Sequence, residues 1–329
     1  MTLAPVSPRL ALVLGATGGI GGATARALLA HGWRVRAMAR DLSRVPTDDR
    51  IDWVQGDALV PADVLAAAAG ASVIVHGVNP PGYRHWARLV MPMLEATLAA
   101  ARATGARIVL PGTVYNYAPD GPAFLAEDAP QATTTRKGRI RIAMEAALEA
   151  SGLPVLIVRC GDFFGPGSGN SWFGQVVAPP GLTAITDPGR PGLVHAWAYL
   201  PDVAETIARL LASDLENFAR FHMRGHEWDG AGLAEAIRRV TGRPDLRLKR
   251  FPWPLVRLAS PVVPLFRELL EMRYLWRRPL RLDNRKLVAT LGEEPHTPLD
   301  EALRASLQAP APEADGHARQ TMAIPPRLG

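Results

Sequence analysis

The sequence lacks several features that would each indicate a particular class of protein. Cysteine occurs once among its 329 residues, as Cys160, which excludes an intramolecular disulfide framework and favours a reducing, cytoplasmic location. No apolar run reaches the roughly 18 residues of a membrane-spanning segment, and the N-terminal residues lack the pattern of a signal peptide. No His, Cys and Asp residues have metal-ligand spacing. We therefore predict no transmembrane segment and no metal site.

Lysine is also scarce, since it occurs only at Lys137, Lys249 and Lys286, although the formal net charge is +6. Arginine supplies the other cations, and they are scattered along the chain rather than gathered with aromatic residues on one face. This distribution argues against nucleic-acid binding. A small anionic ligand explains the charge with fewer assumptions, so we expect a small-molecule partner and no nucleic acid.

The first two-thirds of the sequence alternates short apolar runs with helical patterns. The runs that read as strands are 9–15, 33–40, 51–57, 71–78, 106–112 and 153–160. The helical patterns between them are 20–32, 61–70, 84–104 and 139–150. This alternation predicts an α/β protein with a doubly wound parallel sheet, the Rossmann fold, connected by right-handed crossovers.

The pattern becomes less regular after Gly161, which indicates a second, smaller lobe that binds the substrate. We predict that residues 1–165, completed by 193–213, form a nucleotide-binding domain. Residues 166–192 and 214–307 form the substrate-binding lobe, and residues 308–329 form a disordered tail. Segment 251–282 mixes tryptophan with arginine. It either roofs a substrate pocket, touches a membrane surface or packs as part of the lobe.

A glycine-rich turn follows the first predicted strand. The stretch VLGATGGIGGATA places Gly15, Gly18 and Gly21 in G-x-x-G-x-x-G spacing, directly before a predicted helix. In such a turn the first glycine permits the tight bend, the second lets the backbone approach a pyrophosphate, and the third lets the helix pack on the strand. The helix N-terminus completes an anion site. The pattern therefore indicates dinucleotide binding.

With these motifs the chain resembles the short-chain dehydrogenase/reductase superfamily, in its extended or atypical branch of NAD-dependent epimerase/dehydratase-like proteins. The resemblance covers roughly residues 9–305 and rests on the stretches GATGGIG, RCGDFFGPG, LVHAWAYLPDVAETI and LDNRKLVATLGEEPHTPLDEAL. It implies that Asp57 contacts the adenine and that the chain passes the cofactor's ribose at Asn79. The cofactor-binding residues that we expect are Gly15, Thr17, Gly18, Gly19, Ile20, Gly21, Arg40, Asp57 and Asn79.

The end of the second predicted strand indicates which nicotinamide cofactor binds. NAD-specific proteins carry an acidic residue there for the ribose 2′-hydroxyl, whereas this chain has Ala39 followed by Arg40. A guanidinium pairs well with a 2′-phosphate, and Arg36 is a second candidate for the same role. Asp41 weighs against this interpretation. We therefore expect NADP, with NAD as the second choice.

The catalytic residues of the family are missing. The resemblance implies a Tyr-x-x-x-Lys pair and a Ser or Thr at the end of the fifth strand. These three positions hold Lys137, Arg141 and Pro111, respectively. Proline offers no donor, and a guanidinium does not deprotonate in the working range.

Two interpretations of this departure remain open. In the first, an NADP-dependent oxidoreductase or epimerase/dehydratase-like enzyme acts on a carbonyl or hydroxyl substrate through a rebuilt site. Its catalytic residues would be Lys137, Tyr115, Thr113 and Arg141, with Tyr117 as a further hydroxyl, and burial and neighbouring arginines would depress the pKa of Lys137. In the second, the chain is a non-catalytic NADP(H)-binding sensor or partner protein.

Several expectations hold under both interpretations. The arginines around Lys137 clamp a phosphate or carboxylate at a helix N-terminus, so the substrate has an anionic group, and the tryptophan-rich lobe suggests an apolar body. His76 and His195 lie on predicted strands and are expected to be structural. A homodimer remains open.

Overall fold

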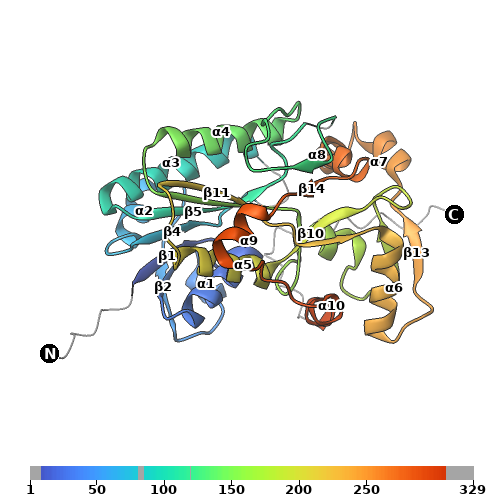
Figure 1. Cartoon of the computed structure of the whole chain (residues 1–329), viewed down its shortest axis with the longest axis horizontal. Helices are drawn as coiled ribbons and strands as arrows, with labels where there is room; N and C mark the ends of the chain where they lie inside the picture. The colour runs from blue at the N-terminus through green and yellow to red at the C-terminus, as the bar shows by residue number, and fades with distance from the viewer. Residues whose placement is uncertain (1–8, 81–84, 119, 309–329) are drawn as a thin grey trace.

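The computed structural model describes residues 9–80, 85–118 and 120–308 (Figure 1). In these residues the main sheet has seven strands in the order β11-β7-β5-β4-β1-β2-β3. All neighbouring pairs are parallel, so the predicted doubly wound sheet is confirmed. Its strands are β1 (Leu10–Leu14), β2 (Arg34–Ala39), β3 (Ile51–Gln55), β4 (Val73–His76), β5 (Arg107–Thr113), β7 (Val155–Cys160) and β11 (Phe218–His222).

Helices cover both faces of this sheet (Figure 1). On one face α1 packs against α5, which contacts α9, and on the other α3 packs between α2 and α4. Apolar side chains alternate along each strand between two cores, as in β1, where Leu12 belongs to one core and Val13 to the other. The helices are α1 (Gly19–Ala30), α2 (Pro61–Ala67), α3 (Trp86–Thr104), α4 (Arg136–Ala150), α5 (Leu200–Leu211) and α9 (Arg285–Leu291).

Two differences from the predicted elements affect the site. Helix α4 begins at Arg136, three residues before the predicted start, because Thr135 caps it by accepting a hydrogen bond from the Gly138 amide. Strand β11 was missed, and Phe218–His222 forms the edge of the main sheet. The predicted lobe segment 214–307 therefore contains one strand of the nucleotide-binding sheet. The sequence offered only a short run there, FARFH, with a cation at its centre.

The smaller lobe is built from short elements. In the described part of the chain its sheets have the orders β12-β10-β8, β13-β9 and β14-β6. The strands are β6 (Phe124–Leu125), β8 (Asp162–Phe164), β9 (Ala184–Asp187), β10 (His195–Tyr199), β12 (His226–Trp228), β13 (Arg247–Arg250) and β14 (Arg281–Leu282). The helices of the lobe are α6 (Gly230–Thr241), α7 (Trp253–Ala259), α8 (Pro264–Met272), α10 (Leu299–Gln308) and the short turns η3 (Phe173–Val177) and η4 (Arg273–Trp276). The short turn η1 (Leu42–Arg44) instead follows β2 of the main sheet.

Tryptophans form the centre of the lobe. Trp172 contacts both Trp253 and Trp276, and Trp197 contacts Trp276 as well. All four are buried, so part of segment 251–282 packs as core. Every helix in residues 9–80, 85–118 and 120–308 is too short or too polar to cross a membrane. Apart from Gln308, which ends α10, the predicted disordered tail lies outside the described residues.

Candidate cofactor and active site

The glycine-rich turn closes tightly on the ends of β1 and β4. Gly15 has a φ of +84°, and a Cβ there would lie 2.6 Å from the carbonyl oxygen of Gly77. A Cβ on Gly21 would lie 2.2 Å from the Gly15 carbonyl oxygen, so α1 meets the turn at a distance that only glycine permits. Thr17 and Gly18 at the tip are exposed. The turn is therefore a cradle that side chains would fill, as a pyrophosphate site requires.

Gly19 brings the lobe side of the chain to this cradle. A Cβ on Gly19 would lie 2.7 Å from the Gly167 carbonyl oxygen and 2.9 Å from the side chain of Leu200. The predicted cofactor residue Gly19 thus contacts the stretch GPGSG that follows β8. This contact holds the start of α1 against the segment that leads into the lobe.

The end of β2 presents one exposed guanidinium toward the same edge of the sheet. Arg40 is exposed, and its side chain makes no hydrogen bond or ion pair to the described residues, while its carbonyl oxygen accepts from Gln55. The neighbouring Asp41 is engaged locally, since its carboxylate accepts from the amide and hydroxyl of Ser43 at 3.0 and 2.7 Å. These hydrogen bonds lower the pKa of Asp41.

Arg36, the second candidate for a 2′-phosphate, is committed elsewhere. Its guanidinium binds Asp52 at 2.8 Å and the carbonyl oxygens of Ala67 and Ala69 at the end of α2. This use of Arg36 differs from the expectation. Asp57 lies after β3 as expected, partly exposed, and one of its carboxylate oxygens accepts from the Leu59 amide.

Arg141 and Asn79 meet at the end of β4. Arg141 donates to the Asn79 side-chain oxygen at 3.3 Å, and its guanidinium carbon lies 4.8 Å from the ring centre of Trp86. Two residues that the resemblance assigned separately, one to catalysis and one to the ribose, are thus brought together. The arrangement places a fixed cation where the chain passes the expected ribose site.

Lys137 has different surroundings from those expected. Its ammonium group binds Glu268 and Glu271 of α8, the latter at 2.8 Å, and its amide donates to Glu271. Arg136 binds the same two carboxylates. The expected cationic environment of Lys137 is therefore wrong: anions from the lobe surround a side chain that is 2% exposed. Of the cations expected to clamp a phosphate, Arg136 and Lys137 thus bind carboxylates of the chain itself, whereas Arg139 donates to the Thr134 carbonyl oxygen.

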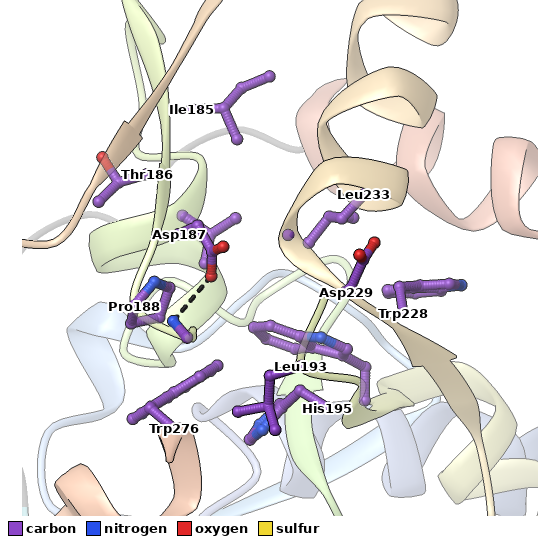
Figure 2. A pocket seen from close by; sticks show the side chains of 14 residues that line it. Ile185, Thr186, Asp187, Pro188, Leu193, His195, Trp228, Asp229, Leu233 and Trp276 are labelled. Carbon is purple, nitrogen blue, oxygen red and sulfur yellow. Dashed lines mark hydrogen bonds between the residues drawn. The ribbon is translucent and has the colours of Figure 1, made fainter. Parts of the chain in front are cut away.

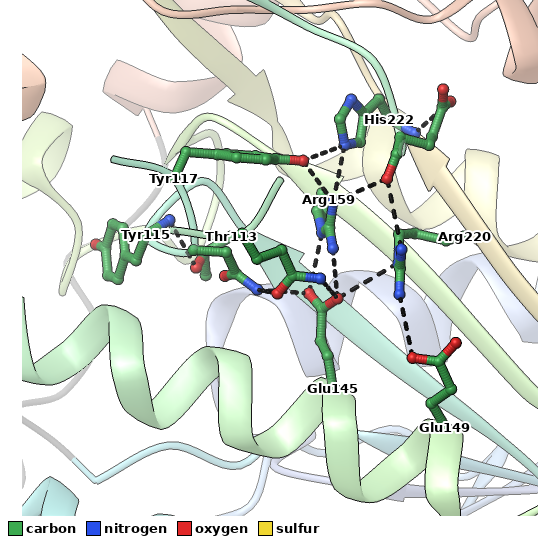
Figure 3. A network of polar contacts seen from close by, with 11 residues as sticks. Thr113, Tyr115, Tyr117, Glu145, Glu149, Arg159, Arg220 and His222 are labelled. Atoms are coloured by element: carbon green, nitrogen blue, oxygen red, sulfur yellow. Dashed lines mark hydrogen bonds and ion pairs between the residues drawn. The ribbon is translucent and has the colours of Figure 1, made fainter. Parts of the chain in front are cut away.

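The hydroxyl groups after β5 divide into two sets. Thr113 is half-buried at the carboxyl end of β5, where its hydroxyl accepts from the Tyr115 amide at 3.3 Å. Tyr117 lies in the core instead, and its hydroxyl contacts His222 and Arg159. Burial raises the pKa of Tyr117 to about 12. Figure 3 shows the ring of Tyr115 pointing away from Arg159, so Thr113 and Tyr115 remain candidates and Tyr117 does not.

A buried ion pair anchors this region (Figure 3). Arg159 on β7 is fully buried and binds Glu145 on α4 through two nitrogens, at 3.0 and 2.5 Å. Asn116 also donates to Glu145 at 2.9 Å. Burial opposes the charge on Arg159, but the hydrogen bonds from its guanidinium to Glu145 outweigh this effect and the pKa of Arg159 lies above its ordinary value. The network orients the chain after β5 relative to α4.

The lobe contains an apolar pocket beside its tryptophans (Figure 2). His195 and Trp276 form one wall, with their rings stacked 3.9 Å apart. His195 also binds Asp162 at 2.7 Å. The cavity volume is about 20 Å³, room for one water or so. His195 is therefore held on both sides by neighbours within the lobe, Asp162 and Trp276.

A larger and more open cleft, of about 380 Å³, lies between the start of α4 and the lobe. Thr134 and Thr135 contribute one side of its lining. The opposite side comes from α7, α8 and η4, through Arg257, Leu270, Glu271, Arg273, Tyr274 and Arg277. Three of these residues are arginines, so the cleft has a basic wall.

His76 and His226 are also buried, whereas His296 is exposed. His76 bonds through Nδ1 to the hydroxyl of Thr97 at 2.8 Å, and burial, with the charge of Arg141, lowers its pKa to about 3. His226 and His296 gather with Asp202 so that their ligand atoms lie within 4.8 Å of one another.

The group of Asp202, His226 and His296 lies where two segments of the chain are connected. Asp202 accepts from the amide and hydroxyl of Thr297 at 2.8 and 2.6 Å, which ties the segment before α10 to α5. Spacing along the sequence did not reveal this group because its members come from three distant segments.

Comparisons with known proteins support the binding of a pyridine nucleotide. Residues 15–172 match the model of the NAD(P)H-binding family. The chain is 37% identical over 179 residues to the 3-diazoavenalumate denitrifying reductase of a Streptomyces species, which covers 48% of this chain and 57% of that protein. It is 28% identical over 270 residues to the ceramide reductase of Caulobacter vibrioides (strain NA1000 / CB15N), covering 78% of each. The match to the first relative thus spans little more than half of its length.

Solved structures with the same fold include nucleotide-sugar enzymes. The Bordetella bronchiseptica enzyme WbmH in complex with NAD+ superposes with a TM-score of 0.69 at 16% identity, covering 91% of this chain and 97% of that one. UDP-glucuronic acid 4-epimerase from Bacillus cereus in complex with NAD gives 0.71 at 15% identity and the same coverage. The solved structures confirm the predicted fold, the match over residues 15–172 supports binding of a pyridine nucleotide, and both curated relatives are named reductases.

Proposed function

We propose that the protein is an NADPH-dependent reductase whose substrate is an electrophile that requires little or no proton donation from the protein. The observation that carries this proposal is the contrast between the two halves of the site. The glycine cradle is complete and open at Thr17 and Gly18. The position of the family's proton donor instead holds Lys137, buried between two carboxylates.

The residues around the cradle fit a nicotinamide dinucleotide. In this proposal Gly15, Thr17, Gly18, Gly19, Ile20 and Gly21 hold the pyrophosphate at the start of α1. Asp57 holds the adenine, and Asn79 with Arg141 holds the ribose at the nicotinamide end. The bound cofactor supplies a hydride. Every other requirement of the reaction falls on side chains of the chain.

Exposed Arg40 supports NADPH over NADH. A 2′-phosphate carries negative charge that a guanidinium binds through two parallel hydrogen bonds. The carboxylate of Asp41 would repel that phosphate if it faced the same way, but its hydrogen bonds to Ser43 turn it into the cap of η1. The position that selects NADP therefore has one available cation and no free acid beside it.

Proton transfer separates the reactions that this family fold performs. Epimerases and dehydratases begin by oxidising a hydroxyl, which needs a base at that oxygen, and carbonyl reduction needs an acid there. Pro111 offers no hydroxyl, and Lys137 is held by Glu268 and Glu271. Thr113 and Tyr115 are the remaining hydroxyls. The site therefore favours a reduction that needs no proton donor over both epimerisation and carbonyl reduction.

A diazo substrate meets this constraint. When an aromatic diazonium group is reduced, its C–N bond breaks and the bonding pair leaves with N₂, while hydride forms the new C–H bond. No oxygen anion develops, so no acid is required from the protein. The Streptomyces relative is named for the reduction of a diazo compound with loss of nitrogen, which supports this class. A carbonyl substrate is the alternative, and Thr113 or Tyr115 would then be the proton donor.

The non-catalytic interpretation is the second candidate, and the absence of the Tyr-x-x-x-Lys pair favours it. In that case the chain binds NADP(H) as a sensor or partner protein. Its binding residues are the same, so only turnover separates the two candidates.

The deciding experiment incubates purified protein and NADPH with a carboxylated aromatic diazonium salt or with the aldehyde of the same skeleton. We expect faster NADPH consumption with the diazonium salt, and transfer of deuterium from labelled NADPH into the new C–H bond. Thr113→Ala should slow any aldehyde reduction and leave diazonium reduction unchanged. Tight NADPH binding without turnover of either compound would favour the sensor, and failure to bind NADPH or NADH would contradict both candidates.

A further inference from the structure

Three exposed apolar side chains of the lobe gather at α7. Leu255, Leu258 and Val262 are 46%, 78% and 81% exposed. Their spacing of three and four residues places them on one side of α7 and of the turn that follows it. Trp253 and Val256 occupy the opposite side and are buried. Figure 1 shows α7 and α8 at the edge of the molecule, beyond the start of α4.

Arginines surround these apolar side chains without acidic partners. Arg257, Arg267, Arg273 and Arg277 lie on α7, on α8 and in or directly after η4, and none forms an ion pair with the described residues. The acids of the same segment, Glu268 and Glu271, are bound by Arg136 and Lys137 instead. The surface around α7 is therefore apolar at its centre and positively charged at its margin.

The basic wall of the open cleft adjoins this surface. Arg257 lines the cleft and lies between Leu255 and Leu258 along α7. Arg273 reaches the cleft with its Nε shielded from solvent and without a hydrogen-bond partner. Burial and, after it, the charges of Arg277, Arg257 and Arg190 lower the pKa of Arg273.

We propose that α7, the α7–α8 turn and the arginine-lined cleft dock on an anionic membrane surface. Leu255, Leu258 and Val262 enter the boundary of the acyl chains, and Arg257, Arg273 and Arg277 bind lipid phosphates. Amphipathic elements with this division of apolar and basic residues lie in the plane of the interface rather than crossing it. This inference concerns location and stands independently of the reductase activity.

A membrane fits this surface better than a protein partner does. Three apolar side chains on a short helix form too small a core for a stable protein–protein interface, which buries roughly 800 Å² on each partner. A membrane needs no matched shape, because each exposed apolar side chain and each cation contributes separately. The unpaired Nε of Arg273 also calls for an acceptor, which a phosphate oxygen provides.

The test measures flotation of the full chain with vesicles of phosphatidylcholine alone or mixed with phosphatidylglycerol. We expect binding only to the mixed vesicles, weakened by salt. The double variant Leu258→Asp with Val262→Asp should weaken binding at least about tenfold, since two buried aliphatic side chains are lost. Arg257→Gln with Arg277→Gln should weaken it roughly 25-fold, about five-fold for each cation.

Matched controls come from the opposite part of the molecule. Val60→Asp with Leu65→Asp changes two side chains that are 42% and 46% exposed, and Arg34→Gln with Arg102→Gln removes two exposed cations. Both should leave vesicle binding unchanged after allowance for net charge. Equal losses in test and control variants would overturn the proposal, as would displacement by free glycerol phosphate at constant ionic strength. A change in oligomeric state with Leu258→Asp and Val262→Asp, without vesicle binding, would assign the surface to a second copy.

Discussion

The ammonium nitrogen of Lys137 lies 2.8 Å from a carboxylate oxygen of Glu271, a residue 134 positions later in the chain. The contact joins α4, which packs on the nucleotide-binding sheet, to α8 of the lobe. Glu271 also accepts a hydrogen bond from the Lys137 amide, so the carboxylate caps the start of α4 as well as neutralising the lysine. At the position where the family has its proton donor, this chain has an ion pair that connects the nucleotide-binding domain to the lobe.

Removal of Lys137 should destabilise the protein without abolishing cofactor binding. Lys137→Ala leaves the mostly buried carboxylates of Glu268 and Glu271 without the positive charge of the lysine. Loss of one partner of such a buried pair costs on the order of 3 kcal/mol. Urea unfolding monitored by tryptophan fluorescence measures the change in the free energy of unfolding. NADPH affinity of the folded variant should stay within about threefold of the original.

Arg139→Ala is the control for that measurement. Arg139 lies two residues away on the same helix, is exposed, and donates only to the Thr134 carbonyl oxygen. Its loss should change the free energy of unfolding by about 0.5 kcal/mol or less. If Lys137→Ala instead keeps full stability and loses turnover, then Lys137 acts in catalysis and the structural interpretation is wrong.

Arg40 should control the choice between NADPH and NADH. Charged hydrogen bonds to phosphate contribute roughly 1.5–3 kcal/mol, so Arg40→Ala should weaken NADPH binding by about 10- to 150-fold and leave NADH binding unchanged. Titration followed by nicotinamide fluorescence measures both affinities. Arg34→Ala, at the other end of β2, should change neither. Equal weakening of both nucleotides would place Arg40 elsewhere on the cofactor.

The buried pair of Glu145 and Arg159 should be among the most sensitive positions of the domain. Glu145→Gln removes the negative charge that neutralises the buried Arg159 guanidinium. The substitution should lower the free energy of unfolding by about 3–5 kcal/mol. Glu149→Gln, one helical turn along on the exposed side of α4, is the matched control and should be nearly neutral. Similar losses from the two substitutions would show that burial of the pair is unimportant.

Acid should weaken the fold well before its carboxylates titrate. Burial lowers the pKa of both His76 and His222 to about 3, below their ordinary value of 6.5. The unfolded chain therefore binds protons that the folded chain excludes. Stability is complete above pH 6.5 and falls by about 1.4 kcal/mol per pH unit for each histidine as the pH drops toward 3. Urea midpoints measured across this range give the slope.

Glu271 adds a second effect at lower pH. Burial raises the pKa of its carboxyl group, but hydrogen bonds from Lys137 outweigh this and hold the pKa below 4.5. A lowered pKa means that the stabilisation is present above pH 4.5 and is lost as the pH falls through the folded value. His76→Gln should reduce the slope above pH 4.5, and Glu271→Gln should reduce only the slope below it. A flat stability profile down to pH 5 would contradict the buried, neutral histidines.

Local sequence determined the nucleotide-binding fold because its signals are local. Continuous apolar runs such as that of β1 require burial on both faces, and Gly15 and Gly21 occupy positions where a Cβ would collide with backbone. These requirements are read from neighbouring residues, so the sheet and the cradle were both predicted. The edge strand β11 was missed because its short run FARFH carries a cation at its centre.

Tertiary structure decided the chemistry of the second half of the site. The sequence showed Lys137 among arginines, whereas the fold brings Glu268 and Glu271 to it from more than 130 positions away. Likewise the sequence left Arg36 available to a phosphate, whereas the fold places Asp52 and the end of α2 beside its guanidinium. Charge interactions depend on distance in space and on burial, and neither is encoded in spacing along the chain. Local pattern therefore determined where the cofactor cradle lies, and long-range packing decided which side chains remain available for chemistry.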